Sequence, residues 1–208
     1  MPKKLLIFDF DGTIADTLVI AEQIMLELSP EFNLPAVSRQ EIIHLKHKSI
    51  PELLKISGLS WRQVPQFVRK ARLCFKKYID QVKPITGMPD ILHNLRGQGY
   101  RMGILTSNSL DSVNVFLNNH ELQLFEFVYS PDSLFGKSRV IRRVMRKNRM
   151  EPQDMVMIGD EIRDVEAAHK AGVDSIAVTW GFNSAELLQA HSPVYMVHQP
   201  EELLHLLG

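Results

Sequence analysis

The sequence is poor in the features that mark secreted, membrane-embedded and nucleic-acid-binding proteins. It contains one cysteine, Cys74, so no disulfide can form within the chain, and we expect a reducing, cytoplasmic location. No apolar run approaches the ~18–20 residues of a membrane span. The apolar run before Asp9 is too short for a secretion signal. The 24 basic and 24 acidic residues balance, so neither nucleic acid nor a membrane is an expected partner.

What the sequence does contain is a regular alternation of short apolar runs with amphipathic segments. Apolar residues make up 45% of the chain, enough for a substantial core. The alternation predicts an α/β fold with a doubly wound, mainly parallel, Rossmann-like sheet and helices on both faces. After a first strand that ends at Asp9, the expected strands are 101–106, 127–129, 154–158, 174–178 and 194–197, and the helices between them 110–119, 138–147, 163–171 and 184–190.

Residues 17–85 break this alternation, because they show helical patterns and no convincing strand. Turn signals such as Ser29-Pro30 separate the expected helices, which are 18–28, 38–45, 50–57 and 61–79. We interpret this stretch as an all-α cap domain inserted into a catalytic core that comprises residues 1–16 and 86–208.

Charge divides along the same boundary. The segment 17–85 carries 11 basic and 6 acidic residues, whereas the rest of the chain carries 13 basic and 18 acidic residues. An acidic core beneath a basic cap would suit a metal ion below and an anionic substrate between them. Charge scattered over solvated helix faces explains the same asymmetry, and both interpretations stay open.

The motif Asp9-Phe10-Asp11-Gly12-Thr13 is the first candidate for chemistry. Alternate side chains of a strand share a face, so both carboxylates can reach one point as the chain leaves the sheet. An unpaired buried carboxylate costs several kcal/mol or changes its pKa strongly. The pair therefore needs a cation or a reacting group beside it.

Further polar residues follow other apolar runs or precede a helix. Because the carboxyl ends of parallel strands meet at one edge of a sheet, we expect those at strand ends to converge on Asp9. Thr106 alone could equally cap a helix, and acids after a strand could simply favour a helix N-terminus. The candidates are Thr106, Ser107, Asn108, Lys137, Asp160 and Asp164.

The order and spacing of these motifs resemble those of the haloacid dehalogenase superfamily, in its phosphoglycolate-phosphatase-like branch with a small helical cap. The resemblance implies that Asp9 attacks phosphorus to form an aspartyl-phosphate and that Asp11 is the general acid and base. It also implies a Mg²⁺ ion on the Asp9 carboxylate, the Asp11 backbone carbonyl and the Asp160 carboxylate.

The same resemblance assigns the remaining candidates. Thr106, Ser107 and Asn108 would hold phosphoryl oxygens, and Lys137 would neutralise developing charge. Asp164 would orient Lys137 or a metal-bound water.

Within the superfamily, Asp11 favours transfer from an oxygen ester, because dehalogenases and phosphonate hydrolases lack this acid. We expect a phosphatase that acts on a small phosphorylated metabolite. A sugar-phosphate mutase is the alternative, although the cap segment around Lys46-His47-Lys48 lacks the glycine usual in related caps and the arginine that holds the distal phosphate in mutases. This segment is the expected specificity element, facing a second anionic group of the substrate. A catalytically idle binding module is a further alternative, and the sequence leaves the oligomeric state open.

Overall fold

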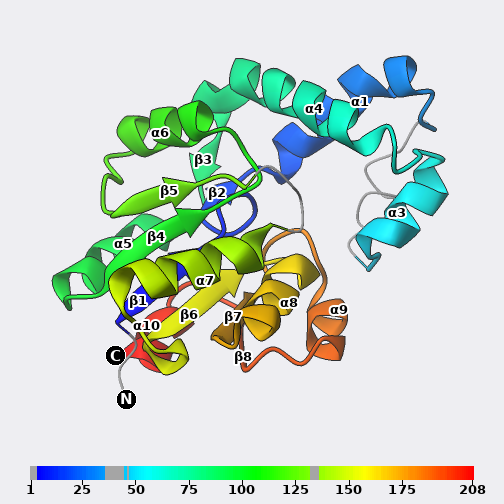
Figure 1. The fold of residues 1–208 in the computed structure, drawn as a ribbon. Coiled ribbons are helices and arrows are strands. Elements are labelled where there is room, and N and C mark those ends of the chain that lie inside the picture. Colours follow the sequence, from blue (N-terminus) through cyan, green and yellow to red (C-terminus); the bar gives the residue numbers. More distant parts are fainter. Residues whose placement is uncertain (1–3, 36–44, 46, 132–135) are drawn as a thin grey trace.

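The structure is a computed structural model that describes residues 4–35, 45, 47–131 and 136–208. Its centre is a six-stranded sheet in the order β5-β4-β1-β6-β7-β8, and every pairing in it is parallel (Figure 1). This confirms the predicted α/β fold class. The strands are β1 (Leu5–Phe8), β4 (Arg101–Leu105), β5 (Phe127–Tyr129), β6 (Met155–Gly159), β7 (Asp174–Val178) and β8 (Tyr195–Val197).

Helices cover both faces of the sheet. Successive residues of a strand point to opposite faces, and the core strands direct apolar side chains to each of them. In β1, Leu6 and Phe8 belong to the core cluster of one face, while Leu5 and Ile7 belong to that of the other. The first face packs on α5 (Met88–Gly97), α6 (Leu110–Asn119) and α10 (Glu202–Leu207). The second packs on α7 (Lys137–Asn148) and α8 (Ile162–Ala171), with α9 (Ala185–Ala190) beside α8.

The segment expected to form the cap contains α1 (Leu18–Phe32), α3 (Ile50–Ser57) and α4 (Val64–Tyr78), and a 3₁₀ turn, Ile79–Gln81, follows them. These helices lie to one side of the sheet in Figure 1. The expected turn at Ser29-Pro30 is wrong, because α1 continues through Pro30 to Phe32. Its buried residues, Ile20, Ile24, Leu28 and Phe32, follow helical spacing as far as that last turn, so packing extends the helix past the proline.

The expectation of no strand between residues 17 and 85 is also wrong. A two-residue strand, β3 (Lys83–Pro84), pairs antiparallel with β2 (Ala15–Asp16). Ile85 N donates to Ile14 O at 2.8 Å next to this ladder. The two chain segments that enter and leave the cap thus run side by side. Two-residue strands are too short to show an alternating pattern in the sequence.

The remaining differences concern the ends of elements and two helices that the sequence did not predict. Lys137 is the first residue of α7 rather than lying before the helix, and α5 and α10 were not assigned from the sequence. The helix expected at 38–45 lies almost wholly outside the described residues. Among the helices that the structure describes, none is long and apolar enough to cross a membrane.

Candidate active site

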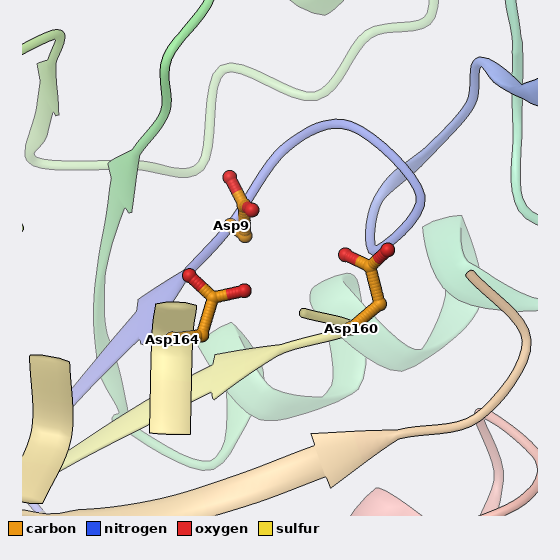
Figure 2. Close-up of side chains that lie close together, drawn as sticks. All are labelled: Asp9, Asp160 and Asp164. Carbon is orange, nitrogen blue, oxygen red and sulfur yellow. The ribbon is translucent and has the colours of Figure 1, made fainter. Parts of the chain in front are cut away.

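Three buried carboxylates meet at the carboxyl edge of the sheet. Asp9 follows β1, Asp160 follows β6, and Asp164 lies in the first turn of α8. One oxygen of each lies within 4.8 Å of the other two. Figure 2 shows the three side chains directed into the same space. Parallel pairing of β1 with β6 places Phe8 beside Ile158, so the residues that follow both strands leave the sheet together.

Lys137 places a positive charge against this cluster. Its Nζ lies 2.7 Å from Asp9 Oδ2 and 2.6 Å from Asp164 Oδ1, and all three side chains are almost fully buried. Burial alone would lower the pKa of Lys137, but the charges of Asp164 and Asp9 outweigh it and raise that pKa. The ammonium is therefore charged at neutral pH and fixed against Asp9.

Asp160 is held by two donors. Thr13 Oγ1 donates to Oδ1 at 2.7 Å, and the Phe182 backbone N–H donates to Oδ2 at 2.7 Å. Burial, followed by the charge of Asp9, raises the pKa of Asp160. Two glycines make room for this carboxylate: a Cβ on Gly12 would lie 2.4 Å from Asp160 Oδ2, and one on Gly181 would lie 2.2 Å from it.

Asp11 lies against the end of β4. Asn108 Nδ2 donates to Asp11 Oδ1 at 3.2 Å, and Thr106 Oγ1 lies 3.5 Å from Asp11 Oδ2. The Thr106 hydroxyl in turn accepts from Asn108 N at 2.9 Å. Desolvation, followed by the charge of Asp9, raises the pKa of Asp11 to about 7. A carboxyl with this pKa can both donate and accept a proton near neutral pH.

The carboxylates fit a divalent cation. Carboxylate oxygens are the ligands that Mg²⁺ prefers. Asp9 and Asp160 offer them close together, and Gly12 and Gly181 leave room for the Asp160 carboxylate. Asp164 lies beside them: its Oδ1 accepts from Lys137 Nζ at 2.6 Å and its Oδ2 accepts from Glu161 N at 3.2 Å, so it can orient the lysine.

The structure describes part of the expected specificity segment. Lys46 lies outside the described residues. His47 Nδ1 is 3.8 Å from Glu186 Oε2, and Lys48 Nζ is 3.7 Å from Glu52 Oε1. Their role in specificity stays a prediction.

A cavity of about 540 Å³ separates the cap from the core on this side. Its cap wall is mostly apolar and includes Met25, Leu54 and Phe67, together with Lys48. Its core wall includes Glu161 and Arg163, which follow Asp160 in the sequence, and Phe182, whose backbone N–H donates to Asp160. The cavity therefore reaches the loops beside the carboxylate cluster.

Sequence reasoning assigned no role to several residues of the site. Thr13 belongs to the first motif, but nothing in the sequence indicates that its hydroxyl donates to Asp160. The contact of the Phe182 backbone with Asp160 leaves no side-chain signal. Arg72, in α4, donates from Nε to Ser107 O at 2.7 Å. The sequence does not distinguish Arg72 from the other basic residues of the segment 17–85.

Comparison with known proteins identifies chains that are similar to this one. The family model described as haloacid dehalogenase-like hydrolase matches residues 6–178. A phosphoglycolate phosphatase of Synechococcus elongatus is 30% identical over 200 residues, covering 96% of this chain and 94% of the relative. A pyrophosphatase of Bacillus velezensis is 26% identical over 98% of this chain and 95% of its own length. A haloacid dehalogenase-like hydrolase structure from Streptococcus pneumoniae superposes with a TM-score of 0.82 at 24% identity, covering 99% of both chains.

Proposed function

This chain belongs to the haloacid dehalogenase-like hydrolase family, as its motifs indicated, and we propose that it is a Mg²⁺-dependent phosphatase. Its substrate is a small phosphorylated metabolite, hydrolysed through an aspartyl-phosphate on Asp9. The relatives named phosphoglycolate phosphatase and pyrophosphatase cover almost the whole chain and support this substrate class. The lone cysteine supports a cytoplasmic location.

One arrangement supports this reaction most strongly. Asp9 is fixed by Lys137 at 2.7 Å, and Asp11, two residues on, is held by Asn108 with its pKa raised to about 7. A nucleophile needs a charged form with a fixed direction, whereas a general acid needs a proton that it can release. The two acids of the motif meet these different needs in one place.

The reaction then takes two steps. An Asp9 carboxylate oxygen attacks phosphorus, the bond from phosphorus to the leaving oxygen breaks, and Asp11 gives that oxygen a proton. In the second step Asp11 takes a proton from water, whose oxygen attacks phosphorus and releases phosphate and the Asp9 carboxylate. Lys137 and the hydroxyl and amides around Thr106 and Ser107 stabilise negative charge on the phosphoryl oxygens.

The Asp9 and Asp160 carboxylates and the Asp11 backbone carbonyl are the groups that would hold Mg²⁺. When bound, the ion supplies positive charge that offsets the carboxylates and the phosphoryl oxygens. Asp164 keeps Lys137 in position through its 2.6 Å contact.

Turnover of p-nitrophenyl phosphate by the wild type and by Asp9→Asn tests this function. The wild type is expected to release p-nitrophenol with Mg²⁺, and Asp9→Asn to be inactive while keeping the circular dichroism spectrum of the wild type. Activity retained in Asp9→Asn would eliminate the covalent mechanism, and an inactive wild type would favour an idle binding module. A screen of phosphorylated metabolites, with pyrophosphate included, identifies the substrate.

A further inference from the structure

One cap residue reaches the loop beside Asp11. Arg72 is a half-buried residue of α4, and its Nε donates to the backbone carbonyl of Ser107 at 2.7 Å. Ser107 lies between Thr106 and Asn108, the two residues whose side chains contact Asp11. A cation of the cap therefore forms a direct hydrogen bond with the segment proposed to hold the phosphoryl group.

The lysines of α4 contact acidic residues instead. Lys70 and Lys77 form ion pairs with Glu31 and Glu27 of α1, within the cap. Lys76 Nζ lies 3.9 Å from Asp111 Oδ2, and both side chains are exposed. Within the described part of the chain, Arg72 has no acidic partner, and the Ser107 carbonyl is its one hydrogen-bond acceptor.

The contact at Nε leaves most of the guanidinium available. A guanidinium is planar and carries five N–H donors, of which Nε has one. Because both Nη atoms are bonded to the same carbon as Nε, they lie within roughly 5 Å of the Ser107 oxygen. A half-buried guanidinium with free Nη groups is suited to bind a carboxylate or phosphate through two parallel hydrogen bonds.

We propose that Arg72 is a substrate-specificity residue, whose Nη groups bind a second anionic group on the leaving group of the substrate. The inference rests on the phosphatase function proposed above. A substrate with its phosphoryl group at Asp9 and a second anion at Arg72 bridges the core and the cap. Both named relatives fit this chemistry, since phosphoglycolate carries a carboxylate and pyrophosphate carries a second phosphate.

Substrate pairs with and without the second anion test the assignment. We would measure kcat/KM with Mg²⁺ for phosphoglycolate, pyrophosphate and p-nitrophenyl phosphate in the wild type, Arg72→Gln and Lys76→Gln. Lys76 is the matched control, because it lies one turn further along α4 and its replacement removes the same charge. Relative to p-nitrophenyl phosphate, Arg72→Gln is expected to lower kcat/KM about ten-fold or more for the better of the two substrates that carry a second anionic group, mainly through KM. Lys76→Gln is expected to leave this ratio within about two-fold of the wild type.

The other outcomes separate the two proposals. If Arg72→Gln lowers all three activities in equal proportion, Arg72 only holds the Ser107 segment and the inference is overturned. Values of kcat/KM that equal those of the wild type for all three substrates overturn it as well. A wild type that hydrolyses p-nitrophenyl phosphate but neither phosphoglycolate nor pyrophosphate also overturns it, and leaves the phosphatase function standing. A wild type inactive on all three contradicts the phosphatase function itself.

Discussion

Lys137 Nζ lies 2.7 Å from Asp9 Oδ2, so the first residue of α7 places its charge against the acid that follows β1. Both side chains are almost fully buried, and removing one partner of such a pair leaves the other charge uncompensated. The lysine also contacts Asp164 at 2.6 Å, so it compensates two acids at once. This shared position makes Lys137 the residue through which the site's charge can be tested.

Replacement of Lys137 by alanine is expected to reduce kcat/KM by about 10²–10³, because one fixed charge on the transferring phosphoryl group is lost. The loss should be similar for p-nitrophenyl phosphate and for the metabolite, since Lys137 acts on the group that they share. Steady-state kinetics on both substrates checks this. A loss confined to the metabolite would instead place Lys137 against the leaving group.

Removal of Mg²⁺ is expected to reduce activity by orders of magnitude, because the Asp9 and Asp160 carboxylates then lack their cation. Mg²⁺ should restore the EDTA-treated wild type but not Asp160→Ala. Thermal unfolding gives a second readout, since a ligand that binds the folded state raises Tm in the wild type and not in Asp160→Ala. Full activity in EDTA would rule out the metal assignment.

Substitution of Gly181 by alanine is expected to weaken Mg²⁺ binding without removing any ligand. The added Cβ would lie 2.2 Å from Asp160 Oδ2, so the carboxylate must move. We expect the Mg²⁺ concentration for half-maximal activity to rise about ten-fold, the range found when the support of a metal ligand is disturbed. Gly97→Ala is the matched control, because no described atom lies within 4 Å of its added Cβ. Equal Mg²⁺ dependence in the two variants would show that Asp160 is not a ligand.

The sheet was predictable because its signals are local. Each core strand is a short apolar run, and Leu5 to Phe8 can be buried on both faces only in a parallel sheet with helices on each side. The predicted strand ends differ by a residue: the sequence predicts Thr106 within a strand, whereas β4 ends at Leu105. Pro30 predicts a turn, because the sequence does not show that packing extends α1 to Phe32.

The candidate residues were predictable where a motif names them, and not where only three-dimensional contact does. Asp9, Asp11 and Asp160 stand out because carboxylates directly follow apolar runs. Arg72 lies 35 positions before Ser107, in a helix with several other cations, so nothing in the sequence distinguishes it. Long-range contacts of this kind depend on how the cap lies on the core, which composition and spacing do not specify.

Direct detection of phosphate on Asp9 tests the central claim. In Asp11→Asn, p-nitrophenyl phosphate can still phosphorylate Asp9, because its leaving group needs no proton, but water is no longer activated to remove the phosphoryl group. Acid quenching with Mg²⁺ present, followed by mass spectrometry of the peptides, is expected to find one phosphoryl group on the Asp9 peptide. The double variant Asp9→Asn with Asp11→Asn should carry none. An unmodified Asp9 peptide in Asp11→Asn, from a protein whose wild type hydrolyses this substrate, would contradict the aspartyl-phosphate mechanism.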